Sequence, residues 1–287
     1  MKVLVTGAGG QMGRDLIETR PRGVDAVGLG HGELDIGDRH AVFEIARKYE
    51  PAVIVNAAAY TAVDRAEDEQ EKAYETNRDG AGYVAGAAQS VGARLIHIST
   101  DYVFDGTKSS PYRPEDAIRP LGVYGASKAA GEERVREASN DTALIVRSSW
   151  LYAAEGNNFV NTMLRLMSER GEVRVVADQT GSPTWVRTVA QAIWNFMAKP
   201  KLAGIYHWTD AGEASWHDFA VAIEEEGNDI GLLKRRCAVV PIRTEDYPTR
   251  AKRPIYSVLD KTSTSEALGY TPPHWRESLR QMLKEKR

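Results

Sequence analysis

The sequence predicts a doubly wound α/β fold, in which helices cover both faces of a parallel sheet. Three observations support this prediction. Short apolar strands alternate with amphipathic helices over the first 150 residues, a glycine-rich turn joins the first strand to the first helix, and this alternation ends after Trp150. Strands that are separated by helices require right-handed crossovers, and such crossovers build a parallel sheet.

Each expected element follows from its hydrophobic pattern. In the first helix, Met12, Leu16 and Ile17 recur on one face, and Pro51 ends the second helix. The expected strands are residues 2–5, 24–29, 52–56, 94–99 and 142–147. The expected helices are residues 10–20, 38–50, 80–91 and 127–139.

The second half of the chain predicts a smaller α/β domain beside the sheet. Residues 1–150 form the expected sheet domain, and the segments around 159–208 are expected to pack on it as well. These segments are the helices 159–170 and 186–198 and the strand 204–208. Residues 211–287 combine short helices with proline-bearing loops, and we expect them to form mainly the substrate-binding domain.

Composition excludes several classes of protein. The 287 residues carry 37 Lys and Arg against 40 Asp and Glu, a formal charge of −3, without the basic blocks that nucleic-acid binding requires. The single cysteine, Cys237, cannot form an internal disulfide or a cysteine-based zinc site. The sequence contains no run of about 18 apolar residues, so it predicts no membrane-spanning helix. We expect a cytoplasmic protein that binds a small molecule, as a monomer or a homodimer.

The turn after the first strand predicts a dinucleotide site. Its pattern places Gly7 at the tight turn, Gly10 where a pyrophosphate approaches the backbone, and Gly13 where the helix packs on the strand. Free N–H groups at the helix start then hold the phosphates. A tight turn that binds nothing is the alternative, and the strand–loop–helix context disfavours it. The first domain is therefore expected to be an NAD(P)-binding Rossmann domain.

The end of the second strand bears on the choice between NADPH and NADH. An NAD site usually places a carboxylate there to bind the ribose 2′-hydroxyl. This chain has Gly30-His31-Gly32, with Glu33 as the first carboxylate. His31 is either a donor to a 2′-phosphate or an ordinary exposed histidine. The pattern favours NADPH, with NADH tolerated.

Other cofactor contacts are expected beyond the glycine turn. Asp35 and Ile36 suit the adenine, and residues 57–61, which follow the third strand, should border the nicotinamide ribose. The complete expected set is Gly7, Gly10, Gln11, Met12, Gly13, His31, Asp35, Ile36, Ala57, Ala59, Tyr60, Thr61, Tyr124 and Lys128.

A catalytic group is predicted from two segments that meet at the carboxyl ends of the strands. Tyr124 and Lys128 are four residues apart, which places them on one helical face. A nearby ammonium lowers the pKa of a tyrosine, and such a tyrosine can donate a proton to a carbonyl oxygen. Thr100 can hydrogen-bond the same oxygen. The Y-x-x-x-K spacing alone is common by chance, but its combination with the glycine turn is not.

These residues carry a resemblance to the extended short-chain dehydrogenases/reductases, and among them to the dTDP-4-dehydrorhamnose reductases. The matching segments are GAGGQMG (7–13), ELDIGD (33–38), VIVNAAAYTAVDRAE (53–67), HISTDYVFDG (97–106), PLGVYGASKAAGE (120–132), RSSWLYAAEGNNFVNTML (147–164), DQTGSPTW (178–185) and KRPIYSVLD (252–260). They cover nearly the whole chain, including its substrate half.

The resemblance implies an activity: reduction of the 4-keto group of dTDP-4-dehydro-β-L-rhamnose to dTDP-β-L-rhamnose by an NAD(P)H-dependent oxidoreductase. It also implies residue roles. Tyr124 would be the proton donor, Lys128 its partner and cofactor ligand, and Thr100 the hydroxyl that tunes the tyrosine. The implied substrate contacts are Thr100, Asp101, Tyr124 and Trp150, with Asn158 and Arg253 as weaker candidates toward the nucleotide end.

Two other functions remain open at this stage. One is a related nucleotide-sugar ketoreductase or epimerase, since a 4-epimerase needs the same Tyr–Lys pair. A dehydratase is disfavoured, because related dehydratases have Thr-Asp-Glu where this chain has Tyr102 in third place. The other is a non-catalytic dinucleotide-binding regulatory subunit.

A metal is not firmly predicted. The six histidines are not separated by i,i+4 or similar intervals that are typical of metal ligands. Some members of the family that this chain resembles are associated with Mg²⁺ through carboxylates. Asp15 is the one candidate ligand here, although Arg187 stands where a further carboxylate would help.

Overall fold

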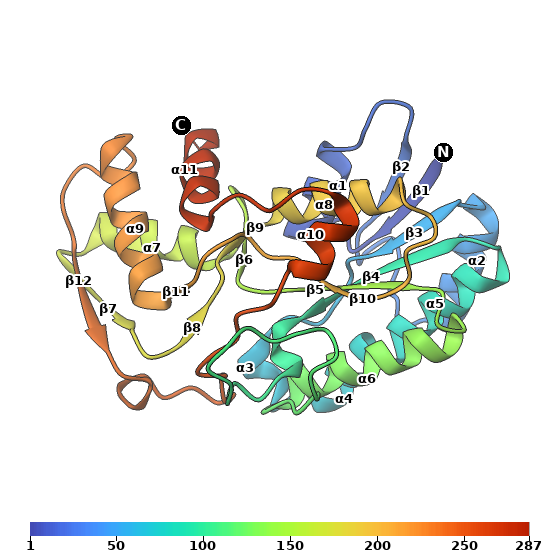
Figure 1. Ribbon diagram of the computed structural model, residues 1–287, viewed down its shortest axis with the longest axis horizontal. Coiled ribbons are helices and arrows are strands. Elements are labelled where there is room, and N and C mark those ends of the chain that lie inside the picture. Colours follow the sequence, from blue (N-terminus) through green and yellow to red (C-terminus); the bar gives the residue numbers. More distant parts are fainter. Residues whose placement is uncertain (287) are drawn as a thin grey trace.

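A computed structural model, which describes residues 1–286, contains a six-stranded parallel sheet at its centre (Figure 1). The strand order is β10-β5-β4-β3-β1-β2. The strands are β1 (Lys2–Thr6), β2 (Asp25–Leu29), β3 (Val53–Asn56), β4 (Arg94–Thr100), β5 (Leu144–Ser148) and β10 (Gly204–His207). All neighbouring strands in this order pair in parallel, and helices lie between successive strands in the sequence, so the doubly wound α/β class is confirmed.

Helices cover both faces of the sheet because alternate strand residues point to opposite sides. On one face, Val3, Val55 and Ile96 pack in a core with α1 (Gln11–Glu18) and α8 (Val186–Met197). On the other, Leu4 and Ile54 pack against a second group of helices. That group comprises α2 (Arg39–Tyr49), α5 (Ala81–Ser90) and α6 (Val123–Ala138).

The helix that carries Tyr124 begins earlier than expected. We expected it at residue 127, but α6 begins at Val123, after Gly122 in an extended conformation. The carboxylate of Glu67 accepts a hydrogen bond from the Val123 N–H at 2.8 Å, which satisfies a donor that the helix itself leaves free. Glu67 lies 56 residues earlier, so no local pattern indicates this cap.

The charged segment before α5 is more regular than its composition indicates. It forms α3 (Val63–Ala66), α4 (Gln70–Tyr74) and a π-helical turn, η1 (Glu75–Gly80), which continues directly into α5. π-Helical turns are rare and occur often at functional sites. Here the turn places Asn77 in the interior, next to α6.

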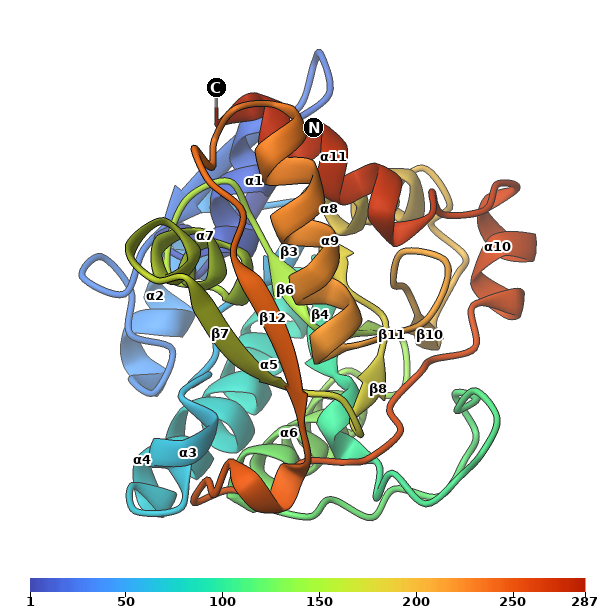
Figure 2. The ribbon, with the colours of Figure 1, turned by 90° about the vertical axis from the view of Figure 1, so that its left-hand side faces the viewer.

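A second, smaller lobe lies to the left of the sheet in Figure 1 and faces the viewer in Figure 2. Its longest helices, α7 (Phe159–Glu169) and α9 (Trp216–Asp229), pack on each other and on a parallel pair of strands. That pair is β7 (Glu172–Val176) and β12 (Ala238–Ile242), and α11 (Trp275–Glu285) packs on α9. The short elements here are β6 (Leu151–Tyr152), β8 (Thr180–Gly181), β9 (Thr184–Trp185), β11 (Ala214–Ser215) and η3 (Thr244–Asp246).

The division between the lobes does not follow a single cut in the sequence. Of the segments expected on the sheet, α8 and β10 do pack there, whereas α7 packs on α9. Conversely, α10 (Thr262–Leu268) contacts β10 and α8, although residues 211–287 were assigned mainly to the substrate domain. The amphipathic face of α7 fits either partner by pattern, so its sequence could not decide between them. Among residues 1–286, none of the helices combines the length and apolar character of a membrane span.

Candidate active site

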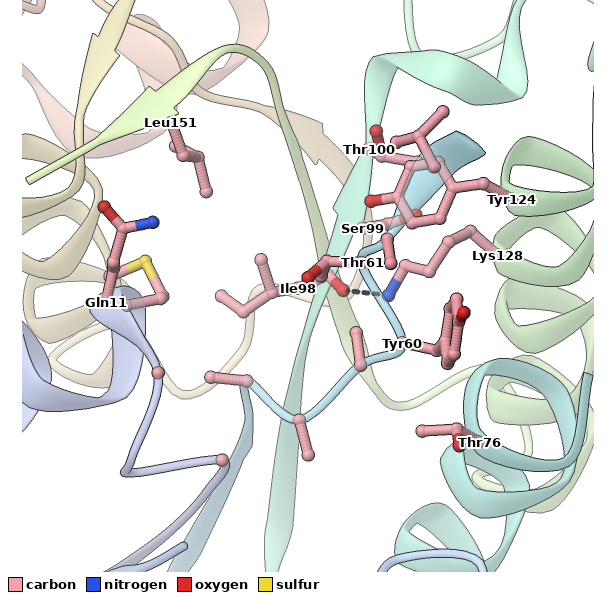
Figure 3. Close-up of a pocket in the computed structure, with 18 of the residues that line it drawn as sticks. Gln11, Tyr60, Thr61, Thr76, Ile98, Ser99, Thr100, Tyr124, Lys128 and Leu151 are labelled. Carbon is pink, nitrogen blue, oxygen red and sulfur yellow. Dashed lines mark hydrogen bonds between the residues drawn. The ribbon is translucent and has the colours of Figure 1, made fainter. Parts of the chain in front are cut away.

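A cavity of about 1030 Å³ opens at the carboxyl ends of β1, β3 and β4 (Figure 3). Ligands of doubly wound sheets bind at this edge. Of the expected cofactor residues, all except Gly13 line the cavity, and so do Thr100, Asp101 and Trp150. Asn158 and Arg253 do not. One cavity therefore holds most of the expected cofactor and substrate residues.

The glycine turn is shaped by two close approaches. Gly7 has a φ of +69°, and a Cβ there would lie 2.6 Å from the backbone N of Ala58. A Cβ on Gly13 would lie 2.4 Å from the Gly7 oxygen and 2.6 Å from the Ala8 Cα. Gly13 was expected to let the helix approach the strand, but the contact that it permits is with the turn itself. The turn is thus folded tightly, and its backbone N–H groups at the start of α1 face the cavity.

The end of β2 carries a local set of turn contacts. Glu33 folds back and accepts a hydrogen bond from the Gly30 N–H at 2.8 Å, and Asp35 accepts one from the Gly37 N–H at 2.9 Å. The His31 side chain is 85% exposed, and its Nδ1 lies 4.0 Å from an Asp35 oxygen. The exposed His31 side chain thus lines the cavity next to the Asp35 carboxylate.

Asn77 joins the nicotinamide side of the cavity to the catalytic helix. Its side-chain oxygen accepts a hydrogen bond from the Tyr60 N–H at 2.8 Å, and its amide donates to the Tyr60 carbonyl and to the Ser127 hydroxyl at 3.0 Å. The sequence analysis missed Asn77, which lies inside a charged segment without a motif. It also missed Arg14, Arg65 and Lys72, which line the cavity.

Tyr124 and Lys128 project from the same face of α6 into the cavity, as Figure 3 shows. The Lys128 ammonium donates a hydrogen bond to the carbonyl oxygen of Ile98 at 2.7 Å. Burial lowers the pKa of Lys128 to about 8, although the Glu132 carboxylate opposes this shift. The predicted placement of the pair is therefore correct.

The predicted effect on Tyr124 is wrong for this arrangement. Burial raises the pKa of Tyr124 to about 12, while a hydrogen bond to Thr100 works in the lowering direction and the Asp101 charge adds to the rise. Lys128 does not lower it, because its ammonium is directed to the backbone of β4. Tyr124 is thus a protonated phenol at neutral pH, which is the form that a proton donor needs.

Thr100 and Asp101 form a small polar group beside Tyr124. The Thr100 hydroxyl donates to an Asp101 oxygen at 3.1 Å and accepts a hydrogen bond from the Tyr102 N–H at 3.2 Å. They end β4 and begin a 3₁₀ turn, η2 (Asp101–Val103). Burial raises the pKa of Asp101 to about 6, while hydrogen bonds with Ser257 and Thr100 oppose the rise. The Asp101 carboxyl is therefore buried at the cavity wall, next to Thr100 and Tyr124.

Trp150 is held by stacking. Its ring lies 3.5 Å from that of Trp216 with an angle of 4° between the planes, and Gly181 approaches it closely on a neighbouring segment. Trp150 also has a φ of +48°, an uncommon conformation for a residue with a side chain. The ring therefore has a fixed position in the cavity wall, and its backbone is held there by the surrounding packing.

Two expected substrate residues are engaged elsewhere. Asn158 caps α7, and its amide donates to Gln11 Oε1 at 2.8 Å and to backbone carbonyls of its own loop. Arg253 is paired with Asp64 at 2.7 Å. In this arrangement the polar atoms of Asn158 bond to its own loop and to Gln11, which lines the cavity, and its contact with substrate stays a prediction.

The side chains around Asp15 do not fit a metal ion. An Asp15 oxygen lies 2.9 Å from Arg187 Nε, and the same guanidinium contacts Glu18 and Glu285. A cation of the protein itself therefore occupies the position between these carboxylates. Across residues 1–286, no three His, Cys, Asp or Glu side chains are grouped so as to hold a metal.

Comparison with known proteins agrees with this geometry. The family model described as "RmlD substrate binding domain" matches residues 1–287. A dTDP-4-dehydrorhamnose reductase of Burkholderia thailandensis is 43% identical, over 96% of each chain. The chain belongs to the dTDP-4-dehydrorhamnose reductase family. A further relative, the spore coat polysaccharide biosynthesis protein SpsK of Bacillus subtilis, is 43% identical over 99% of this chain and 98% of its own.

Solved structures of this reductase family have the same fold. The dTDP-4-dehydrorhamnose reductase of Bacillus anthracis, crystallised in complex with NADP, is 41% identical, with a TM-score of 0.93 over 99% of both chains. A dTDP-glucose 4,6-dehydratase of Streptomyces venezuelae and a UDP-glucose 4-epimerase of Thermotoga maritima share the fold at 18% and 19% identity, with TM-scores of 0.81 and 0.82.

Proposed function

We propose that this protein reduces the 4-keto group of dTDP-4-dehydro-β-L-rhamnose to a hydroxyl, giving dTDP-β-L-rhamnose, with NADPH as the reductant. The observation that carries the proposal is that the glycine turn and the Thr100, Tyr124 and Lys128 side chains meet in one cavity. Family membership over the whole chain supports the choice of substrate.

The residues of the cavity divide the reaction between them. A reduced nicotinamide, when bound, supplies the hydride that attacks the carbonyl carbon. Tyr124 donates its phenolic proton to the carbonyl oxygen, which becomes the new hydroxyl. Thr100 holds that oxygen by a hydrogen bond. The Lys128 ammonium, which rests on the Ile98 carbonyl before the reaction, turns toward the phenolate that remains and stabilises it. Trp150 and Asp101 form the wall on which the sugar rests.

NADPH is the proposed cofactor because β2 is followed directly by Gly30-His31-Gly32, which has no carboxylate for the ribose hydroxyl. The next carboxylates, Glu33 and Asp35, each accept a backbone hydrogen bond in their own turn. The relative from Bacillus anthracis was crystallised with NADP. His31, exposed at this end of the cavity, is positioned to donate to a 2′-phosphate.

The test is a coupled assay with the purified protein. The 4-keto sugar nucleotide is generated by its dehydratase and epimerase, NADPH or NADH is added, and cofactor absorbance and sugar product are followed together. We expect stoichiometric oxidation, faster with NADPH, and formation of dTDP-L-rhamnose. Binding of NADPH without turnover of intact substrate would support the regulatory subunit instead, and a cofactor that copurifies and recycles would support an epimerase.

A further inference from the structure

A row of buried polar side chains crosses three adjacent strands behind the cavity wall. Ser99 of β4 pairs in register with Arg147 of β5, which pairs with His207 of β10. Residues that pair in register on parallel strands point to the same face of the sheet, and here that face is covered by α6. Arg147 and His207 are fully buried, and Ser99 is 5% exposed.

The Glu132 carboxylate of α6 neutralises the charge of Arg147 in this row. Arg147 donates to both of its oxygens, from Nε at 2.9 Å and from Nη2 at 2.6 Å, and the Ser99 hydroxyl donates to it at 2.5 Å. The remaining guanidinium nitrogen, Nη1, donates to the Pro114 carbonyl at 3.2 Å and lies 3.4 Å from His207 Nε2. Burial and the Arg147 charge lower the pKa of His207 to about 3, so this histidine is neutral. The carboxylate is therefore fully hydrogen-bonded and matched by one cation.

The same carboxylate lies one helical turn beyond Lys128 on α6. Ile98, which accepts the hydrogen bond of the Lys128 ammonium, is the residue before Ser99, which donates to Glu132. Two successive residues of β4 thus fasten two successive turns of α6. Loss of the Glu132 contact therefore frees α6 to shift against β4, which carries the acceptor of the Lys128 ammonium.

The charges around Lys128 come from a few elements. Tyr124 and Glu132 lie one turn to either side of it on α6. His97 of β4 lies on the sheet face that α6 covers, and its pKa is well below the ordinary value because of burial and the ammonium. Tyr60, from the loop after β3, faces Lys128 across the cavity (Figure 3). Tyr60 and Tyr124 have raised pKa values, so Glu132 is the anion that acts on the ammonium at neutral pH.

We propose that Glu132 is a positioning residue of the reductase: it anchors the helical turn behind Lys128 to β4 and β5, and its charge keeps Lys128 in the ammonium form. This inference rests on the proposed function in one respect, namely that the ammonium is needed beside the phenolate of Tyr124. The buried ion pair with Arg147 by itself would be weak evidence for a role in stability. Glu132 is connected to the active site by the hydrogen bond that it accepts from Ser99. Ser99 directly follows Ile98, whose carbonyl accepts the hydrogen bond of Lys128.

The primary test measures Lys128 without using the reaction. Protein labelled with ¹³C at the lysine ε-carbon is titrated by NMR, and the Lys128 signal is assigned by its absence from Lys128→Met. In the wild type the midpoint should lie near pH 8. In Glu132→Gln it should fall by about one pH unit or more, since the opposing carboxylate is gone. Glu133→Gln, an exposed change on the next residue, should leave the midpoint where it is.

The second readout is the pH dependence of turnover. Activity should fall as pH rises through the pKa of Lys128, because the ammonium is lost. The alkaline limb of kcat/KM should therefore move to lower pH in Glu132→Gln by the same interval as the NMR midpoint. Glu132→Asp, which keeps the charge, should restore most of the shift.

Two outcomes would overturn the proposal. A Glu132→Gln protein with a lowered unfolding temperature but unchanged Lys128 midpoint would make Glu132 structural only. If the single variant does not fold, Glu132→Gln with Arg147→Met leaves no unpaired buried charge, and an unchanged midpoint there would have the same meaning. A shifted midpoint in a protein whose wild type does not reduce the 4-keto sugar would instead overturn the proposed function and leave the electrostatic role of Glu132 intact.

Discussion

Tyr124 faces the cavity as a phenol that keeps its proton at neutral pH, because burial raises its pKa to about 12. That state suits reduction, in which a proton must reach the carbonyl oxygen as hydride reaches the carbon. The phenolate left behind is the species that needs help. The Lys128 ammonium lies on the same helical face and can turn from the Ile98 carbonyl to stabilise it.

The first residue-level prediction concerns this proton. Tyr124→Phe removes the phenolic hydroxyl and keeps the ring, so we expect kcat to fall by about 10²–10⁴-fold. NADPH affinity, measured by fluorescence titration, should change little. Tyr247→Phe is the matched control, since Tyr247 is 59% exposed and lies outside the cavity lining, and it should retain wild-type turnover. Full activity in Tyr124→Phe would show that another group supplies the proton.

For single residues, the sequence predicted the placement of those side chains whose partners are close in the chain. The four-residue spacing of Tyr124 and Lys128 was sufficient, because both lie on one helix. The hydrogen bond of Asn158 to Gln11, 147 residues away, was not predicted, because no local pattern contains it. Arg253 is paired with Asp64 across 189 residues, a contact that no local pattern contains. Arg253 would have to leave Asp64 to reach a diphosphate.

The glycine turn and α1 act together as the expected phosphate-binding element, because the close packing of the turn determines the direction of its N–H groups. Gly13 is buried at the contact between helix and turn. Gly9 lines the cavity, and a Cβ there would lie 4.0 Å from its nearest neighbour, the Gly30 Cα. The two glycines therefore separate packing from ligand approach.

A pair of substitutions tests this division. Gly13→Ala forces a methyl group against the turn backbone, and we expect it to lower the free energy of unfolding by about 1–3 kcal/mol. Gly9→Ala should leave stability nearly unchanged but weaken NADPH binding, because the methyl group projects into open space at the cavity. Urea unfolding and NADPH titration of both variants measure the two effects. Equal loss of stability in both would contradict the division.

The sequence predicted the positions of helices and strands well, but it predicted less well which segments cap them or pack on them. Strands and helices of the sheet were located within a few residues, because their apolar periodicity is strong. The start of α6 was missed because Glu67 provides its cap from a distant segment. The packing of α7 on α9 was not predicted, because the pattern of an amphipathic helix shows which face is buried and not which element buries it.

Across the whole molecule, the sheet domain and the C-terminal helix meet at one charged cluster. Arg187 of α8 contacts Asp15 and Glu18 of α1 and Glu285 of α11. Its guanidinium also lies 5.0 Å from the centre of the Trp185 ring. The Arg187 guanidinium of α8 thus joins α1, near the start of the chain, to α11, near its end. Without this cation, the three carboxylates would repel one another.

This cluster leads to the last prediction. Because Arg187 already neutralises the carboxylates, a divalent ion would have to displace a bound guanidinium before it could bind. We therefore expect that dialysis against EDTA changes neither the rate of NADPH oxidation nor the unfolding temperature, and that added Mg²⁺ changes neither. The same chelator treatment of Arg187→Gln serves as a comparison, because this variant exposes the carboxylates without a cation. Loss of wild-type activity in EDTA, with recovery on Mg²⁺ addition, would show that a metal binds despite the guanidinium.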